Sequence, residues 1–126
     1  MNKIQFRAWY PEKQKMYEVA KIDMWGDPDQ ATCDLAAIDE ELFDIYLCEV
    51  ETMQYIGIRD KYNREICEGD IVTGLFNHTD IIGHIVYGSD ATFFIERKVL
   101  YGIGLNNAED WLEVVGNIYE NPELLE

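Results

Sequence analysis

The side chains that could do chemistry are few, and the tightest grouping is a pair of carboxylates. Glu68 and Asp70 flank Gly69. Two carboxylates can act as an acid/base pair or bind a metal, but acid/base catalysis needs a sheltered cleft and separated pKa values. We favour a structural interpretation, in which Gly69 permits a sharp turn and Asp70 accepts the backbone N–H groups that hold it.

Histidines and one acidic loop are the other candidate metal ligands. His78 and His84 flank an expected turn but lack the paired spacing of a transition-metal site. Four aspartates crowd the loop around Pro28: Asp23, Asp27, Asp29 and Asp34. Their oxygens make calcium conceivable, but the spacing does not match an EF-hand, so a solvated acidic loop is favoured. We therefore expect no metal.

Three widely spaced cysteines, Cys33, Cys48 and Cys67, form no CxxC pair. Thiols in a reducing cytosol are the simplest interpretation. Nucleophile motifs and phosphate-binding loops are absent as well. We expect no cofactor and no enzymatic activity; an enzyme would need a pocket that gathers Asp70 with His84 or Cys67.

Charge is the strongest compositional signal, with 25 acidic residues against 10 basic ones, a net charge of −15 and a pI near 4.3. Such a field repels a phosphate backbone, because nucleic-acid affinity depends on Lys and Arg. The acidic side chains either keep the surface soluble, or engage a basic partner or imitate DNA. Composition alone leaves these alternatives open, whereas 48% hydrophobic and 13% aromatic residues exclude a disordered tail.

Apolar alternation in the first half of the chain predicts an antiparallel hairpin, with strands over residues 4–9 and 16–22 joined by a turn over 10–15. Residues 25–30 read as a loop. Asp34 is expected to cap a short helix that ends near residue 44. The alternative is a strand that begins near Leu42, since Phe43, Ile45 and Leu47 also alternate.

Short strands with turn signals dominate the second half. We expect strands over the ranges 52–58, 81–87, 91–97 and 111–119, and residues 66–72 are expected to lead into a further strand. The runs Gly-Asp-Ile-Val at 69–72 and Gly-His-Ile-Val at 83–86 resemble the opening strands of SH3-like barrels, where glycines allow sharp bends. The predicted fold is mainly β (α+β) in one domain over residues 1–126. Its lobes are a hairpin with a short helix over 1–50 and an SH3-like small β-barrel over 51–126.

Three stretches together resemble the YopX family. They are IQFRAW at 4–9 with KMY at 15–17, MQYIGIRDK at 53–61 with EICEGDIV at 65–72, and EVVGNIYENPELL at 113–125. Two positions depart from the family pattern: Tyr62-Asn63 replaces the usual Asn-Gly turn, and Cys67 stands where an aromatic commonly precedes Glu-Gly-Asp. The resemblance implies an accessory protein of bacteriophages and prophages with a β-rich fold that includes an SH3-like barrel, and it supplies no catalytic residues.

The tryptophans Trp9, Trp25 and Trp111 are the candidate interaction residues. Trp9 lies on the strand face opposite Ile4 and Phe6. A single sheet buries both faces only if something covers the second one, such as the helix, the barrel or another subunit. A small β domain with open edges is a candidate for self-association.

The leading functional hypothesis is a non-enzymatic phage accessory protein that forms a homo-oligomer and binds an unidentified host or phage protein. One alternative is an acidic DNA mimic that inhibits a host nucleic-acid enzyme. Another is a nucleic-acid-binding barrel with a basic patch of Arg59, Lys61 and Arg64, or of Arg97 and Lys98. The N-terminus lacks the apolar run of a signal peptide, so we expect a cytoplasmic protein in a bacterial host, without a membrane partner.

Overall fold

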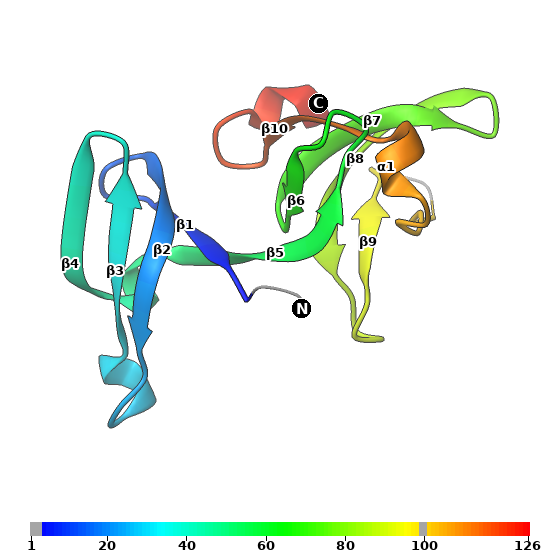
Figure 1. Cartoon of the computed structure of the whole chain (residues 1–126). Coiled ribbons are helices and arrows are strands. Elements are labelled where there is room, and N and C mark those ends of the chain that lie inside the picture. The colour runs from blue at the N-terminus through cyan, green and yellow to red at the C-terminus, as the bar shows by residue number, and fades with distance from the viewer. Residues whose placement is uncertain (1–3, 99–100) are drawn as a thin grey trace. The chain divides into compact units, whose positions relative to one another are not determined.

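The computed structural model describes residues 4–98 and 101–126, and in these residues the chain is built mainly from short antiparallel strands (Figure 1). The strands are β1 (Phe6–Tyr10), β2 (Lys15–Asp23), β3 (Thr32–Ala37), β4 (Glu40–Tyr46), β5 (Glu51–Arg59), β6 (Glu65–Cys67), β7 (Asp70–Phe76), β8 (Thr79–Tyr87), β9 (Phe93–Glu96) and β10 (Glu113–Asn117). The helical segments are η1 (Pro28–Gln30), η2 (Leu47–Glu49), α1 (Ala108–Trp111) and η3 (Pro122–Leu125). None of the described helices is long and apolar enough to cross a membrane.

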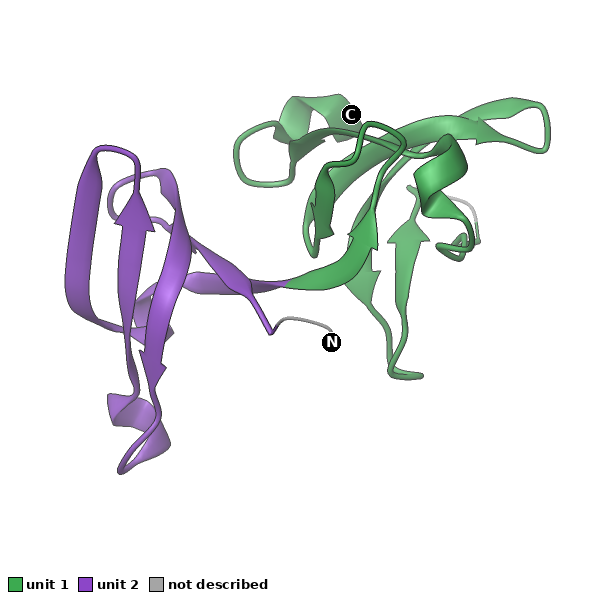
Figure 2. Cartoon of the chain, in the orientation of Figure 1, with its two compact units in different colours: residues 1–2, 55–126 green, residues 3–54 purple. Residues whose placement is uncertain are grey.

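Two compact units divide the described chain, an N-terminal unit of residues 4–54 and a C-terminal unit of residues 55–126 (Figure 2). Strand β5 runs through the boundary. Its first residues pair with β1, where Gln54 lies opposite Phe6, and its later residues pair with β6, where Tyr55 lies opposite Cys67.

The N-terminal unit is an antiparallel sheet in the order β4-β3-β2-β1-β5. The predicted hairpin of the first two strands is confirmed, with Ala8 opposite Tyr17. One face buries a cluster made of Ala8, Tyr10, Tyr17, Cys33, Leu35 and Val50. The rings of Tyr10 and Tyr17 meet edge to face at 6.5 Å, a favourable aromatic geometry.

The predicted helix over residues 34–44 is wrong, because these residues form the β3–β4 hairpin. Leu35 and Leu42 are opposite each other on adjacent strands instead of stacked on one helix face. The Asp34 carboxylate does not cap a helix; it accepts the backbone N–H of Asp44 at 3.0 Å across the hairpin. Ile38 lies fully exposed in the turn between these two strands. The alternative of a strand is correct in type, but β4 begins at Glu40, and Leu42 and Ile45 pack against the core whereas Phe43 is 64% exposed.

The C-terminal unit holds an antiparallel sheet in the order β10-β7-β8-β9, together with β6. Its core gathers residues from every one of the strands β6 to β9 and from α1: Ile66, Val72, Ile81, Ile85, Ile95, Ile103, Ala108 and Leu112. The predicted strands at 52–58 and 81–87 are confirmed. Residues 66–72, expected to lead into a strand, contribute to β6 and β7, with the predicted turn at Gly69 between these strands.

The end of the chain differs from the sequence prediction in one respect. The expected strand over 111–119 is shortened to β10, because the short helix α1 precedes it. Asn107 begins that helix in a left-handed conformation with φ of 57°, which asparagine tolerates better than most residues. The terminal turn at Pro122 is confirmed as η3.

Candidate functional site

The three tryptophans have different environments, and only Trp25 presents its ring to solvent. Trp9 is buried, with 8% of its surface exposed. Trp111 packs against Phe76 with ring centroids 5.6 Å apart, and its indole N–H donates to the carbonyl oxygen of Asn106 at 3.0 Å. Trp25 is 92% exposed. Of the predicted interaction residues, Trp25 is therefore the one that is available for contact.

Local hydrogen bonds shape the segment that carries Trp25, residues 24–30, which we call the Trp25 loop. The backbone N–H of Trp25 donates to the Asp23 carboxylate at 3.0 Å. Gly26 follows in a left-handed conformation with φ of 91°, where a side chain would be strained. The loop then closes through η1, whose last turn is fixed by the bond from Gln30 N–H to the Asp27 carbonyl oxygen at 2.9 Å. These hydrogen bonds thus shape the backbone of the loop, and the Trp25 ring faces solvent.

Next to Trp25, Met24 is 72% exposed, and the loop also carries the exposed carboxylates of Asp27 and Asp29. A large apolar surface with a rim of negative charge suits a partner that has an apolar pocket inside a basic rim. In contrast, no group of three or more His, Cys, Asp or Glu side chains is placed to hold a metal ion in the described residues. The calcium hypothesis therefore gains no support.

The structural interpretation of the Glu68-Gly69-Asp70 turn is confirmed. Gly69 has φ of 86°, and its backbone N–H donates to the carbonyl oxygen of Ile85 at 2.9 Å. Asp70 is 3% exposed, and one of its carboxylate oxygens accepts the backbone N–H of Cys67 at 2.8 Å. Asp70 thus holds the turn between β6 and β7.

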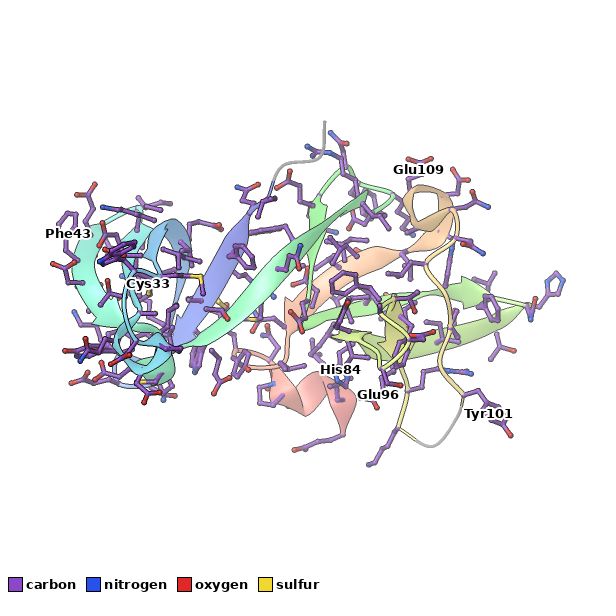
Figure 3. All side chains as sticks on the ribbon, turned by 90° about the horizontal axis from the view of Figure 1, so that it is seen from below. Cys33, Phe43, His84, Glu96, Tyr101 and Glu109 are labelled. Atoms are coloured by element: carbon purple, nitrogen blue, oxygen red, sulfur yellow. The ribbon has the colours of Figure 1, made fainter. Side chains whose placement is uncertain are left out.

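The histidines lie apart along one hairpin. His78 is in the β7–β8 turn, and His84 is in the middle of β8, where its Nε2 lies 3.3 Å from a carboxylate oxygen of Glu96 on β9. Figure 3 shows His84 and Glu96 together on the C-terminal unit.

The cysteines form no disulfide among the described residues. Cys33 and Cys67 are buried, whereas Cys48 is exposed. Burial, with a smaller contribution from the charge of Asp34, raises the pKa of the Cys33 thiol. A buried thiol with a raised pKa is inert, because the thiolate is the reactive form.

Sequence reasoning missed the role of Asp60, which it placed in a charged turn. The carboxylate is buried and accepts the backbone N–H groups of Tyr62, Arg64 and Val114, each at 2.9 Å. The Arg64 Nε donates to it at 3.2 Å. Burial raises the pKa of Asp60, but the hydrogen bonds from Val114, Arg64 and Tyr62 outweigh it, so the pKa lies below its usual value. No sequence signal marks the bond to Val114, 54 residues away.

A second cluster that sequence reasoning missed surrounds Glu40 in the N-terminal unit. Its carboxylate accepts hydrogen bonds from the ammonium of Lys13 and the phenol of Tyr17, and lies 3.3 Å from the ammonium of Lys15. These donors, Lys13 first, lower the pKa of Glu40 to about 2. Burial, followed by the bond to Glu40, raises the pKa of Tyr17 to about 12. The cluster joins the turn after β1 to the β3–β4 hairpin.

The expected basic patch around the β5–β6 turn is largely neutralised. Arg59 lies 3.3 Å from the Glu65 carboxylate. Arg64 pairs with Asp60 and reaches Glu113 at 3.6 Å. The ammonium of Lys61 lies over a tyrosine ring. These cationic side chains therefore contact groups of the protein itself, which leaves less positive charge for a phosphate backbone.

Comparison with known proteins gives a consistent result. A family model described as YopX protein matches residues 5–126. The crystal structure of protein EF1440 from Enterococcus faecalis shares 27% sequence identity over 100% of both chains, with a TM-score of 0.63. The crystal structure of protein yopX from Bacillus subtilis is 18% identical, covers 100% of this chain and 98% of that one, and shares the fold with a TM-score of 0.67. A comparison with curated proteins gave no match.

Proposed function

This chain belongs to the YopX family, and we propose that it is a cytoplasmic accessory protein of a phage or prophage that self-associates and binds a protein partner without catalysing a reaction. The observation that carries the proposal is the exposure of Trp25, at 92%, on an ordered loop. Tryptophan is the residue most enriched among those that dominate binding energy at protein interfaces.

The magnitude of the effect supports a binding role for Trp25. A tryptophan side chain buries roughly 200 Å², and at roughly 25 cal/mol per Å² its burial stabilises a complex by up to about 5 kcal/mol. In the unbound protein this surface faces water. A partner that covers the ring recovers this free energy, and the ordered turn reduces the conformational entropy that binding would otherwise remove.

The partner is expected to be basic around the site that takes the ring. Asp27 and Asp29 flank Trp25, and the whole chain carries a net charge of −15. Opposite charge speeds association and selects the partner, and it does so less at high salt. Self-association should instead increase with salt concentration, because two copies of an acidic chain repel each other and salt screens that repulsion.

The two nucleic-acid alternatives have weaker support. Acidic residues outnumber basic ones in both units by similar margins, whereas a DNA mimic needs carboxylates concentrated along one surface. A nucleic-acid-binding barrel needs available cations, and Arg59 and Arg64 are engaged with carboxylates. We place both alternatives behind protein binding.

Our proposal retains the SH3-like barrel as the architecture of the C-terminal unit. What supports it is a single core shared by β6, β7, β8 and β9, with residues such as Ile66, Val72 and Ile95 in one cluster. Strongly bent strands around one small core are typical of such barrels.

The experiment compares three proteins: wild type, Trp25→Ala and Tyr101→Ala. Tyr101 is the matched control, because it is also 92% exposed but belongs to the C-terminal unit, where its side chain points outward (Figure 3). Partners retained from host extract are identified, produced in pure form, and their affinity for each protein is measured by calorimetry. We expect Trp25→Ala to weaken binding at least about tenfold, as for a dominant interface residue.

Salt dependence and oligomeric state complete the test. Affinity for the partner should fall as salt rises, whereas the self-associated fraction, measured by light scattering after gel filtration, should grow. Equal affinities for the wild type and Trp25→Ala would refute the role of the loop. A monomer at every salt concentration would refute self-association.

A further inference from the structure

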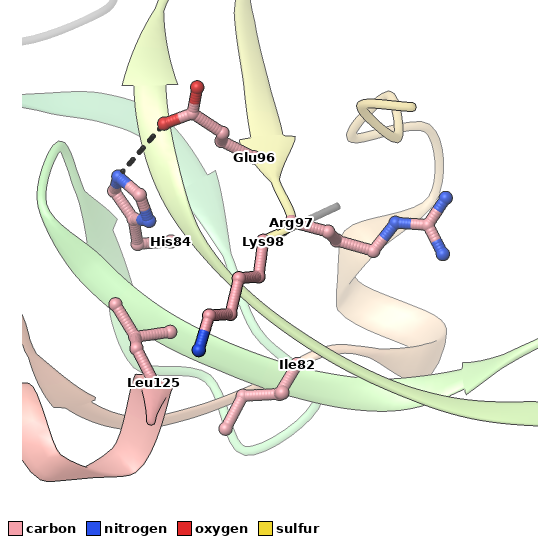
Figure 4. A pocket seen from close by; sticks show the side chains of 6 residues that line it. All are labelled: Ile82, His84, Glu96, Arg97, Lys98 and Leu125. Atoms are coloured by element: carbon pink, nitrogen blue, oxygen red, sulfur yellow. Dashed lines mark ion pairs between the residues drawn. The ribbon is translucent and has the colours of Figure 1, made fainter. Parts of the chain in front are cut away.

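A depression on the C-terminal unit lies over β8 and β9, on the sheet face opposite the core (Figure 4). Its volume is about 400 Å³, and its lining residues are Ile82, His84, Glu96, Arg97, Lys98 and Leu125. Ile82 and His84 alternate along β8 with the core residues Ile81 and Ile85, which places them on the outer face. The volume falls within the roughly 300–1,000 Å³ of small-ligand sites.

The lining combines an aliphatic surface with one available cation. Ile82 and Leu125 supply the apolar surface, and Ile82 is 40% exposed. In Figure 4, Lys98 extends toward Ile82 and Leu125, whereas the Arg97 side chain points away from them. The Arg97 guanidinium is engaged elsewhere, since its Nε and Nη2 donate to the carbonyl oxygen of Tyr101 at 3.0 and 2.7 Å.

In the described part of the chain Lys98 forms no ion pair, a property it shares with Lys21 and Lys61, whereas several other cations are paired. Lys13, Lys15, Arg59 and Arg64 each form at least one ion pair. No carboxylate of the described residues lies within ion-pair distance of the Lys98 ammonium. The ammonium is nevertheless directed toward aliphatic side chains, so the depression offers a positive charge and an apolar surface to the same ligand.

We propose that this depression binds a monoanionic carboxylate carried on an aliphatic group. The carboxylate contacts Lys98, and the aliphatic group packs on Ile82 and Leu125. Glu96 lines the same depression, facing His84, and its negative charge disfavours a dianion such as phosphate. Such a ligand has two sources, the C-terminal residue of a peptide or a free aliphatic acid. This site is separate from the Trp25 loop and does not depend on the proposed function.

The test is a titration of the isotope-labelled full chain, followed by NMR of its backbone amides. The probes are 4-methylpentanoate, the tripeptide Gly-Ala-Leu, the same tripeptide with an amidated C-terminus, and inorganic phosphate. We expect shifts at Ile82, His84, Glu96 and Lys98 with a dissociation constant on the order of millimolar, as an exposed ion pair allows. The amidated peptide and phosphate should bind much more weakly.

The variants are Lys98→Met and, as a control, Lys21→Met. Lys21 is an exposed lysine of the N-terminal unit, so both variants change the net charge equally. Lys98→Met should weaken binding of 4-methylpentanoate about fivefold, a typical effect of losing an exposed charge pair. Unchanged amide positions elsewhere will show that the fold is intact.

The possible outcomes distinguish the two sources of the ligand and include results that would overturn the proposal. Tighter binding of the free-carboxylate peptide than of 4-methylpentanoate assigns the site to a peptide end, and equal or weaker binding of the peptide assigns it to a free aliphatic acid. Equal binding of the amidated peptide, an equal loss in Lys21→Met, or no shifts at tens of millimolar ligand would each overturn the proposal.

Discussion

Replacing Asp60 with asparagine (Asp60→Asn) removes the charge from the most extensive buried hydrogen-bond centre that we identify in the C-terminal unit. The carboxylate is 2% exposed and accepts three backbone N–H groups and the Arg64 Nε. One oxygen accepts from Tyr62 and Arg64 backbone, and the other from Val114 and the Arg64 side chain. Asparagine keeps one acceptor oxygen and turns an NH2 group toward the other pair of donors.

The magnitude follows from the donors that lose their acceptor. If the oxygen near Val114 becomes NH2, the Arg64 side chain can turn to solvent because it is half exposed, but the Val114 N–H is left without an acceptor. An unsatisfied buried group costs about 1–3 kcal/mol, and the remaining hydrogen bonds lose the charge that strengthened them. We expect Asp60→Asn to lower the free energy of unfolding by about 3 kcal/mol.

The effect should depend on pH with a defined sign. The pKa of Asp60 in the folded protein lies below its usual value, so the unfolded chain takes up the proton first as the pH falls. The stabilisation is therefore complete at neutral pH and decreases below about pH 4. The difference between the wild type and Asp60→Asn should shrink in the same range.

Urea unfolding followed by circular dichroism gives the free energies, and hydrogen exchange of the Val114 amide gives a local measure. Asp80→Asn, the same chemical change at an exposed position of the C-terminal unit, is the control and should change stability by less than about 0.5 kcal/mol. A loss below about 1 kcal/mol for Asp60→Asn, or a loss that is unchanged at acid pH, would refute the reasoning.

Two further predictions concern a close packing contact and the Glu40 cluster. A Cβ at Gly74 would lie 2.6 Å from the carbonyl oxygen of Trp111 and 2.7 Å from its ring, so Gly74→Ala should destabilise the protein by about 2 kcal/mol and shift tryptophan emission, as measured by urea titration with fluorescence. In Glu40→Gln, the pKa of Tyr17 should fall from about 12, because the phenol loses its charged acceptor; phenolate absorbance at alkaline pH measures it.

Each of these predictions has a matched control. Gly104→Ala adds the same methyl group where nothing lies within 4 Å, so its stability should stay near that of the wild type. Glu41→Gln removes the same charge from the exposed neighbour of Glu40 and should leave the Tyr17 titration unchanged. Similar effects in a variant and its control would contradict the corresponding prediction.

Local patterns in the sequence were sufficient for much of the fold. The first hairpin and the strands around residues 52–58 and 81–87 follow from alternation of apolar and polar residues, which the two-residue period of a strand imposes directly. The turn at Gly69 also follows, because glycine adopts positive φ without strain and the aspartate after it accepts backbone hydrogen bonds. The resemblance to the YopX family came from such local segments, and the family model that matches residues 5–126 confirms it.

Where the sequence pattern fitted both a helix and a strand, tertiary contacts decided which of the two formed. Residues 34–45 fit both a helix and a strand, and the pairing of Leu35 with Val19 on β2 and Leu42 on β4 selected the strand. Val19 lies outside the window of residues 34–45, so the periodicity of that window carries no information about this contact.

The sequence by itself determined a β-rich, acidic chain of this family with three candidate tryptophans. Only the tertiary structure decided that Trp25 is exposed while Trp9 is buried. It alone also placed the Asp60 carboxylate where it accepts the backbone N–H of Val114, and Lys98 in the same depression as Leu125. The physical reason is that residue type sets what a side chain can do, whereas burial and proximity depend on which distant segments pack against it.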